Sequence, residues 1–387
     1  MRGRRRLVTG LLAIGLVVTG LLIGCERDSA GEPRAGFAGL GADAGGFTPV
    51  APEASLRFPE DHGPHPGTRL EWWYLTANLR DAEGTPLGIQ WTLFRRALRP
   101  PSAPAAGAWA ADQLWMAHVA VSRGADHRVA ERFARGAGQG GDAEARQAGV
   151  TAAPFRAWLD DWRLESRVAA GAGDALDRLV VSAEAGQGEA AFGYRLSLDA
   201  EGPLVRHGKP AFGEGSAEAT GPIYLSQPFY RVTGTVTLGD ERLTVSGRAW
   251  LDREWGNRLM APWHRGWDWF SLHLASGHKL MVYQLRGEAA SDTTLFGTWI
   301  AADGETRALD GEALTLVPLA TRSVAGRELP LRWRLTLPAQ GLDLEVSARH
   351  PNRWMATSVP YWEGAVTVRD RDGGAARGEG YLEMTGY

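Results

Sequence analysis

The sequence predicts an all-β protein made of two copies of an antiparallel β unit, a sandwich or a barrel. Apolar and polar residues alternate with a period of two through most of the chain, and turn residues separate the alternating runs at short intervals. Helical periodicity is scarce, and residues 142–148 are its best short candidate. A tryptophan-led hairpin that begins at Trp73 is followed by a similar hairpin that begins at Trp269, which indicates an internal duplication.

The first 24 residues have the pattern of an export signal. A basic segment that includes Arg2 precedes an uncharged apolar run over residues 7–24, which is slightly short for a transmembrane span. The run ends in Leu22-Ile23-Gly24-Cys25, which resembles the bacterial lipobox, where the cysteine is lipidated and becomes the first residue of the mature protein. An uncleaved membrane anchor with an incidental cysteine is the alternative.

The residues after this run predict a lipid-anchored chain with a flexible start. Cys25 is the only cysteine, so we expect neither a disulfide nor cysteine chemistry in the mature protein. The next residue, Glu26, is not the aspartate that favours retention in the inner membrane of Gram-negative bacteria, so we expect an outer-membrane anchor facing the periplasm. Residues 25–47 are rich in small residues without apolar periodicity and predict a tether.

The remainder of the chain divides into two predicted domains, residues 48–230 and residues 231–387. Alternating residues predict three hairpins, over residues 229–249, 331–348 and 365–384. The boundary between the domains follows from the duplication, whose seam we place at this point of the chain. A chance similarity between tryptophan-rich strands is the alternative.

The composition excludes several classes of function. The 387 residues include 42 Lys and Arg and 45 Asp and Glu, a net charge of −3, which argues against a dedicated nucleic-acid binder. No HExxH zinc motif, P-loop motif or GxSxG nucleophile motif occurs. We expect no cofactor and no metal, since a histidine pair in a Pro/Gly loop, His62 and His65, is most often solvated surface. The 16 tryptophans suit wide apolar cavities.

The segment from Gly247 to Gly256 is the richest candidate for chemistry. Strand parity places Trp250, Asp252 and Glu254 on one face, with Arg253 and Trp255 on the other. A carboxyl group flanked by indoles is desolvated, which raises its pKa and makes it a proton donor at neutral pH. The alternative is that both carboxylates pair with neighbouring arginines in a structural network at a barrel rim.

Two further segments carry polar residues among aromatic ones. The next strand contains Trp267, Asp268 and Trp269, and we expect Asp268, with His264 or His273, to orient Asp252 or carry a proton. The first copy of the duplication offers Glu71, Trp72, Trp73 and Tyr74 at the equivalent place, while His118 is expected to be a buried histidine with satisfied hydrogen bonds. Aromatic core with hydrogen bonds at the rim is the alternative for the strand of Asp268, and a structural carboxylate at the strand entrance is the alternative for Glu71.

Several motifs together resemble the carotenoid 1,2-hydratase family and its AttH-like secreted relatives. They span residues 58–387 and are Glu71-Trp72-Trp73-Tyr74, Tyr224-Leu-Ser226-Gln-Pro228, Trp250-Leu-Asp252-Arg-Glu254-Trp255, Gly266-Trp267-Asp268-Trp269-Phe270 and Gly380-Tyr381-Leu-Glu383-Met-Thr-Gly386-Tyr387. The resemblance implies two lipocalin-like, or calycin, antiparallel β-barrels packed together. Its hydratases add water across the terminal C=C bond of acyclic carotenoids without a cofactor, through protonation of the alkene to a tertiary carbocation.

The resemblance also assigns roles to residues. Asp252 matches the aspartate that is held to be the proton donor of the hydratases, whereas Tyr224-Leu-Ser226 replaces their upstream His-x-Trp pair. This departure places the chain nearer the AttH-like branch, which is often encoded beside ABC-transporter components.

Two hypotheses follow from these patterns. The first is a lipid-anchored periplasmic protein that binds an apolar ligand, a lipid or isoprenoid, and works with an ABC transporter. Its expected ligand-binding residues are Glu71, Trp72, Trp73, Tyr74, Tyr224, Trp255, Trp267, Asp268 and Trp269. The second is a cofactor-independent hydro-lyase, in which Asp252 is the general acid and Glu254 and Trp250 assist it.

Overall fold

The computed structural model describes residues 37–41, 45–51, 53–103, 111–136, 146–169, 171–208, 221–372 and 374–387. The predicted export signal, Cys25 and the larger part of the tether lie outside the described residues, as does most of the predicted helix. Among the described residues, no helix is long and apolar enough to cross a membrane. The helices that the structure describes are single 3₁₀ turns: η1 (Phe37–Gly39), η2 (Glu60–His62), η4 (Gly188–Ala190), η5 (Ala290–Asp292), η6 (Gly311–Ala313) and η7 (Pro338–Gln340).

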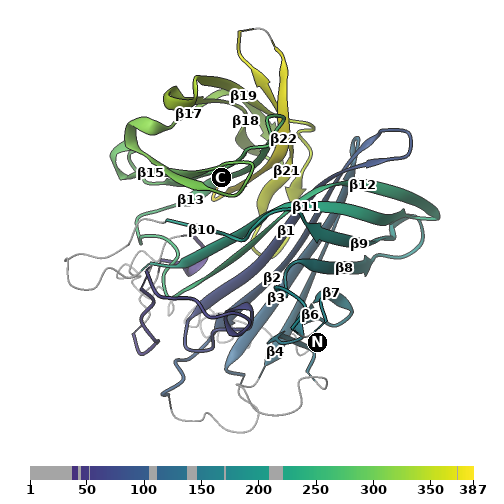
Figure 1. Cartoon of the computed structure of the whole chain (residues 1–387), viewed down its shortest axis with the longest axis vertical. Coiled ribbons are helices and arrows are strands. Elements are labelled where there is room, and N and C mark those ends of the chain that lie inside the picture. The colour runs from purple at the N-terminus through teal and green to yellow at the C-terminus, as the bar shows by residue number, and fades with distance from the viewer. Residues whose placement is uncertain are drawn as a thin grey trace, which may run out of the picture. The chain divides into compact units, whose positions relative to one another are not determined.

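The first sheet contains twelve strands, all paired antiparallel, in the order β4-β3-β2-β1-β12-β11-β9-β8-β7-β6-β5, with β10 added beside β11. The strands are β1 (Leu70–Asp81), β2 (Pro86–Ala97), β3 (Gln113–Arg123), β4 (Asp126–Gly136), β5 (Ala148–Ala152), β6 (Phe155–Leu159), β7 (Trp162–Ser166), β8 (Arg178–Ala185), β9 (Phe192–Ala200), β10 (Val205–His207), β11 (Ile223–Leu238) and β12 (Glu241–Gly256). The sheet curls until β4 lies against β5 and β6, so its two ends approach each other as in a barrel (Figure 1).

The second sheet contains ten strands in the order β16-β15-β14-β13-β22-β21-β19-β18-β17, with β20 added beside β21. The strands are β13 (Gly266–Leu274), β14 (Lys279–Arg286), β15 (Thr294–Ile300), β16 (Thr306–Asp310), β17 (Thr315–Val324), β18 (Arg327–Leu337), β19 (Leu342–Ala348), β20 (Trp354–Met355), β21 (Tyr361–Asp370) and β22 (Ala376–Thr385). The all-β prediction of two antiparallel barrel-like sheets is therefore confirmed.

The two sheets share one topology, which supports the predicted duplication. Each begins with a four-stranded meander, β1 to β4 or β13 to β16, and each closes with a last strand that returns to pair with its first strand, β12 on β1 and β22 on β13. The short strands that lie beside the main strand order also correspond, because β10 pairs with β11 as β20 pairs with β21. The closing hairpin β11–β12 is thus the counterpart of β21–β22.

This topology corrects the predicted boundary between the domains. The prediction divided the chain between residues 230 and 231, within β11, but the hairpin of β11 and β12 belongs to the first sheet. The division between the sheets falls between Gly256 and Gly266. The physical reason is that β12 closes the first sheet by pairing with β1 along its whole length, from Leu70 opposite Gly256 to Asp81 opposite Val245.

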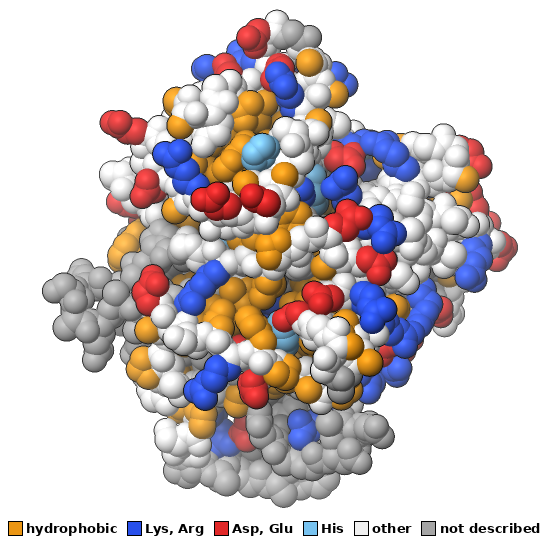
Figure 2. Space-filling model, viewed as in Figure 1, with side chains coloured by type: hydrophobic (Ala, Val, Ile, Leu, Met, Phe, Trp, Pro, Cys, Tyr) orange, Lys and Arg blue, Asp and Glu red, His pale blue; other side chains and the backbone are white. Residues whose placement is uncertain are grey.

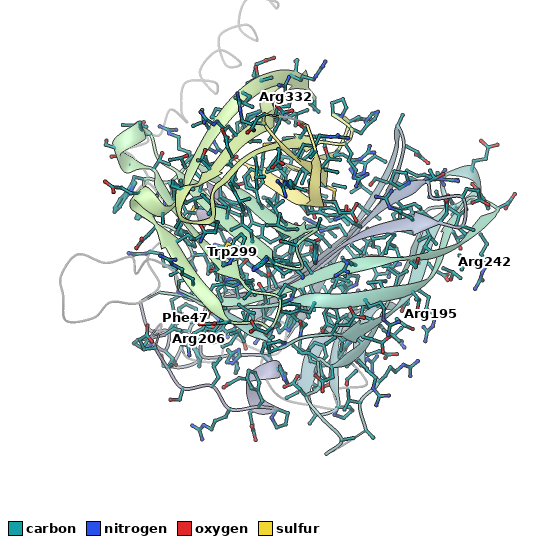
Figure 3. All side chains as sticks on the ribbon, turned by 45° about the horizontal axis from the view of Figure 1, so that its top comes forward. Phe47, Arg195, Arg206, Arg242, Trp299 and Arg332 are labelled. Carbon is teal, nitrogen blue, oxygen red and sulfur yellow. The ribbon has the colours of Figure 1, made fainter. Side chains whose placement is uncertain are left out.

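Three large apolar clusters are among those that result from this arrangement. One fills the inner face of the first sheet and includes Trp73 and Trp91, and a second fills the inner face of the second sheet and includes Trp333. The third cluster joins the sheets, because Tyr74 and Trp250 of the first sheet pack with Trp269 of the second. Many charged side chains of the strands point outward instead, as Figure 3 shows for arginines at the labelled positions 195, 242 and 332.

The closing strands depend on close backbone contact. A Cβ atom at Gly247 of β12 would overlap the carbonyl of Asn78 in β1, and one at Gly380 of β22 would overlap the carbonyl of Ser271 in β13. Gly247→Ala and Gly380→Ala should each lower the free energy of unfolding by about 1–3 kcal/mol, because the strand pairs must separate. Urea unfolding measures this. The control is Gly208→Ala, since nothing lies near its Cβ position, and equal stability of all three variants would contradict the prediction.

Candidate functional site

A cavity of about 230 Å³ lies between the two sheets. It is lined by Ala38, Leu40, Leu70, Glu71, Trp72, Tyr74, Phe94, Arg95, Arg96, Leu114, Met116, His118, Phe133, Tyr224, Asp252, Glu254, Trp267, Trp269, Tyr283, Ser358, Val359, Tyr361, Glu383 and Thr385. Most of these side chains are apolar or aromatic, and Phe133 and Ser358 are exposed. Hydrophobic side chains gather in hollows on the face shown in Figure 2. The site therefore lies between the sheets rather than inside either of them.

Asp252 of β12 is buried and reaches this cavity. Its Oδ2 accepts a hydrogen bond of 2.6 Å from the hydroxyl of Tyr224, and its Oδ1 accepts one of 2.6 Å from Nε1 of Trp250 and another from Ser226. These donors are neutral, whereas the alternative drawn from the sequence required arginine partners. Burial raises the pKa of Asp252 to about 7, although the three hydrogen bonds lower it.

The predicted parity of β12 is confirmed. Glu254 is buried, lines the cavity and raises the pKa of Asp252 further by its charge. Trp250 lies behind Asp252, where its ring contacts Trp269 edge to face with centroids 6.5 Å apart. Arg253 points the opposite way, and its guanidinium donates to Glu71 at 2.8 Å. Of the three residues proposed for catalysis, Asp252 and Glu254 therefore line the cavity, while Trp250 supports them.

Two aromatic side chains cross between the sheets beside Asp252. The hydroxyl of Tyr74 in β1 donates to Oε1 of Glu363 in β21 at 2.7 Å. In the reverse direction, Nε1 of Trp269 in β13 donates to the hydroxyl oxygen of Tyr224 in β11 at 2.8 Å. The two crossing rings meet edge to face with centroids 5.3 Å apart. Each sheet therefore completes the hydrogen bonding of the other's acidic group.

Glu363 and Glu383 form a second acidic centre that sequence reasoning missed. They lie directly opposite each other on β21 and β22, and Glu363 is buried while Glu383 is half-buried. Burial raises the pKa of Glu383 to about 7, and burial together with the charge of Glu383 raises the pKa of Glu363 well above its ordinary range. Trp267 donates to Oε1 of Glu383 at 2.5 Å.

A comparison of the two copies of the duplication would have identified this acidic centre from the sequence. Asp252 lies opposite Tyr74 and Ser226 on its neighbouring strands, and Glu383 lies opposite Trp269 and Glu363. Glu383 thus occupies in the second sheet the position of Asp252 in the first. Aligning the two copies at their closing hairpins, rather than at their opening ones, brings these two acids into register.

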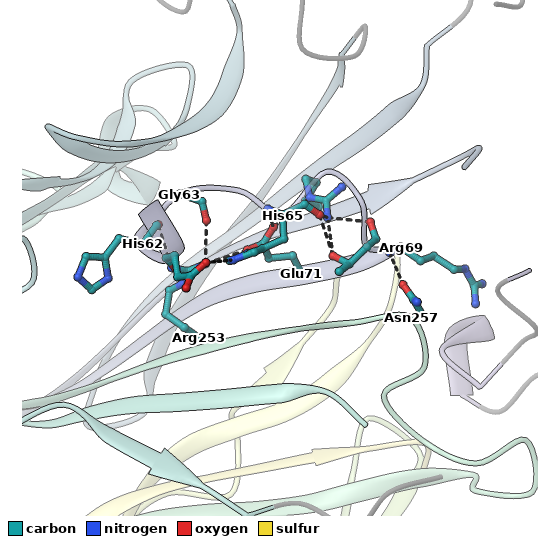
Figure 4. Close-up of polar contacts among 10 residues, drawn as sticks. His62, Gly63, His65, Arg69, Glu71, Arg253 and Asn257 are labelled. Carbon is teal, nitrogen blue, oxygen red and sulfur yellow. Dashed lines mark hydrogen bonds and ion pairs between the residues drawn. The ribbon is translucent and has the colours of Figure 1, made fainter. Parts of the chain in front are cut away.

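Glu71 borders the cavity, but its carboxylate is engaged in an ion network (Figure 4). It contacts Nδ1 of His65 at 2.7 Å, Nε of Arg95 at 3.2 Å and Arg253 at 2.8 Å. Burial alone would raise its pKa, but these partners together lower it to about 2. Glu71 therefore remains ionised and anchors the loop before β1. The expected solvated surface for the histidine pair is wrong, because His62 is buried and His65 stacks on Trp255 with ring centroids 4.1 Å apart.

Three of the predicted ligand-binding residues do not line the cavity. Trp73 lies in the inner core of the first sheet, and Trp255 packs against His65. Asp268 faces the other side of β13, where it binds Arg286 and accepts a hydrogen bond of 2.8 Å from the hydroxyl of Tyr387. The expected contact between Asp268 and Asp252 is not formed. The predicted set Trp72, Tyr74, Tyr224, Trp267 and Trp269, in contrast, does line the cavity.

A histidine is connected to the Asp252 carboxyl group through one intervening residue, Ser226. Nε2 of His207 in β10 is 2.7 Å from Oγ of Ser226, which itself donates to Asp252. Nδ1 of His207 is 2.8 Å from the hydroxyl of Thr298 in the second sheet. The sequence motif around Tyr224 and Ser226 contains no histidine, and only the pairing of β10 with β11 brings this one into place.

The buried carboxyl group of Asp252 should make stability depend on pH. In the folded state the pKa of Asp252 is about 7, above its ordinary value of 3.8. The protonated carboxyl group therefore stabilises the fold in full below pH 3.8, and this stabilisation is lost as the pH rises through about 7. Asp252→Asn cannot ionise and should be more stable than the wild type above pH 7, by up to about 4 kcal/mol. Urea unfolding across this pH range measures the effect. Asp372→Asn, in an exposed turn, is the control, and a wild-type pH dependence in Asp252→Asn would contradict the assignment.

Comparison with known proteins agrees with this fold. The family model described as AttH-like matches residues 49–387. A crystal structure of an AttH-type protein from Nitrosomonas europaea is 31% identical and superposes with a TM-score of 0.72, covering 88% of this chain and 100% of that one. Kievitone hydratase from Nectria haematococca, at 17% identity and a TM-score of 0.60, shares the fold over 88% of this chain and 98% of its own. A search of curated proteins gives no match. The chain belongs to the AttH-like family.

Proposed function

We propose that the protein binds an apolar small molecule, a lipid or an isoprenoid, in the cavity between its two sheets. The observation that carries this proposal is a cavity with an aromatic and aliphatic lining that ends at buried carboxyl groups. Pockets of this type, mostly apolar with a few placed polar groups, are typical of small-molecule sites. Trp72 and Phe94 are only half-buried and line it, so apolar surface is available to a ligand.

The charges around the cavity support a neutral ligand. Of the two arginines in the lining, Arg95 is paired with Glu71. A carboxylate or phosphate beside the other acids, Asp252, Glu254 and Glu383, would face like charge. The protonated form of Asp252 or Glu383 is instead a hydrogen-bond donor to a hydroxyl or carbonyl oxygen. The polar end of the proposed ligand is therefore an uncharged oxygen, and its remainder is hydrocarbon.

The proposed setting of this binding is the bacterial cell envelope. The lipobox-like residues that end at Cys25 support a lipid anchor, and residues 25–47 support a tether that would hold the two sheets in the periplasm near the outer membrane. A partner among ABC-transporter components follows from the family resemblance. In this proposal the protein holds an apolar compound before or after its passage through the transporter.

A second candidate function is acid-catalysed hydration of a C=C bond. A carboxyl group of pKa about 7 in an aromatic cavity favours it, because such a group is half protonated at neutral pH. In the proposed step, the O–H bond of Asp252 breaks and its proton bonds to one alkene carbon. A water oxygen then bonds to the carbocation at the other carbon, and the water proton returns to a carboxylate. The indoles of Trp267 and Trp269 are placed to stabilise the cation.

Binding is tested by filling the cavity. Met116 is half-buried in the lining, so Met116→Trp should weaken binding of the neutral probe N-phenyl-1-naphthylamine by about tenfold or more, because the indole takes the ligand's volume. Probe fluorescence measures the affinity, and native mass spectrometry of the membrane-extracted protein detects a co-purified lipid. Leu98→Trp, at an exposed position outside the cavity, is the matched control. Equal affinities in the two variants would place binding elsewhere.

Hydration is tested with an acyclic carotenoid that carries a terminal C=C bond. Asp252→Asn should lower the rate by about 10²–10⁴-fold, because the proton donor is removed. The wild-type rate should also fall as pH rises through about 7, where Asp252 ionises. Product analysis by liquid chromatography measures both. Asp268→Asn removes a buried carboxyl group outside the cavity and serves as the control, and an unchanged rate in Asp252→Asn excludes this mechanism.

A further inference from the structure

The glutamate pair on the second sheet has an unusual set of contacts. Glu363 and Glu383 are opposite each other in register, and Tyr74 and Trp267 each donate a hydrogen bond to one of them. Within the described part of the chain, Oε2 of Glu363 is buried and has no hydrogen-bond partner. Two carboxylates held this close in an apolar site cannot both stay ionised, so the pair retains a proton.

A line of polar groups runs from this pair to the protein surface. Tyr361 lies two residues before Glu363 on the same face of β21, and its hydroxyl is 3.0 Å from Nδ1 of His118 in β3. Nε2 of His118 is 2.9 Å from Oε1 of Glu131 in β4. His118 is buried, as expected from the sequence, whereas the Glu131 side chain is 18% exposed and is held by Ser358.

The hydrogen bonding along this line has two consistent states. When His118 is neutral, Nε2–H donates to Glu131 and Nδ1 accepts from Tyr361, which leaves Oε2 of Glu363 without a donor, as the structure has it. When His118 is protonated, both ring nitrogens donate, so the Tyr361 oxygen accepts and its hydrogen turns toward Glu363. Gln90 donates to the same oxygen at 3.2 Å in either state. Rotation of one hydroxyl group therefore links the two ends of the line.

We propose that Glu363 and Glu383 form a proton-holding pair, of which Glu383 lines the cavity, and that Glu131, His118 and Tyr361 exchange its proton with solvent. The use of this proton in a reaction rests on the proposed function of the cavity. In a hydration, Asp252 protonates the alkene from one sheet while a carboxylate of the pair accepts the proton of the attacking water from the other. The exchange path itself does not depend on any ligand.

Other ionisable groups face the pair and set its charge. Tyr74 stabilises the ionised form of Glu363 by hydrogen bonding, and Asp252 and Glu254 favour the protonated form of Glu383 by like charge. The remaining tyrosines that sense the charge of the pair are Tyr194, Tyr283 and Tyr381. Around His118, the facing groups are Glu131 and Tyr361, with the ring of Phe94 at 5.4 Å.

The test measures proton exchange at the pair in the full chain without ligand. Infrared difference spectra of the wild type, taken below the pKa of about 7 of Glu383, should contain a carbonyl band of a buried protonated carboxyl group. This band should change in both Glu363→Gln and Glu383→Gln, which assigns it to the pair. Transfer into deuterated buffer then shifts the band at a rate that reports exchange with solvent.

Three variants interrupt the path and one does not. Tyr361→Phe, His118→Gln and Glu131→Gln should each slow the exchange by at least about tenfold while the band itself remains. His127→Gln, on β4 beside the path, is the matched control and should exchange at the wild-type rate. Tyr361→Phe removes one oxygen from a packed ring, and its melting temperature verifies the fold.

Two outcomes would overturn the proposal. Exchange at the wild-type rate in both Tyr361→Phe and His118→Gln would show that the proton reaches solvent by another route. A wild-type spectrum in which neither glutamine variant alters a protonated-carboxyl band would show that the pair holds no proton. Failure of the proposed function is separate, because it would appear as absent probe binding and absent hydration in a protein whose exchange still depends on Tyr361.

Discussion

The crossed contact between Tyr74 and Trp269 is the interaction on which the arrangement of the site depends. Each ring leaves its own sheet and donates a hydrogen bond to a polar group on the other, Tyr74 to Glu363 and Trp269 to Tyr224. Without Tyr74, the buried carboxyl group of Glu363 would lack its donor in an apolar environment, at a cost of several kcal/mol for an ionised group. The same side chains therefore pack the two sheets together and donate hydrogen bonds to polar groups of the cavity.

The two halves of the site are topologically equivalent but chemically different. On the first sheet, Asp252 is surrounded by neutral donors, with Ser226 leading to His207. On the second sheet, the strand position of Ser226 is taken by Glu363, so that the acid at the equivalent position, Glu383, has a carboxyl neighbour. One half thus holds a single acid tuned by hydrogen bonds, and the other holds two acids that compete for protons.

Local patterns in the sequence predict much of this structure. Alternation identifies the strands, and parity places Asp252 and Glu254 together with Arg253 on the opposite face. This alternation does not reveal that the C-terminal half of β12 is buried on both faces. One face packs toward the core of its own sheet and the other toward the second sheet. Trp73 lies on the face toward the core of the first sheet, and Glu71 pairs with Arg253 rather than with the acids of the cavity, so adjacency in sequence was misleading for both.

Long-range pairing explains the remaining differences. The return of β12 to β1 joins residues far apart in the chain, and no local signal distinguishes this from the start of a new domain. His207 and Glu131 likewise enter the site only through strand pairing and through packing between the sheets. Glu383, in contrast, becomes visible from sequence when the closing hairpins of the two copies are compared with each other.

The shared topology has a consequence for the origin of the cavity. Contacts run from β1 to β21 and from β13 to β11, and because β1 corresponds to β13 and β11 to β21, this is the self-complementary pattern of a two-fold dimer. A single ancestral sheet that paired with its own copy would have enclosed a symmetric cavity with two identical acids. When the two copies are joined in one chain, residues on one side of the cavity can change without the same change on the other side. The difference between Asp252 on the first sheet and the glutamate pair on the second is a change of this kind.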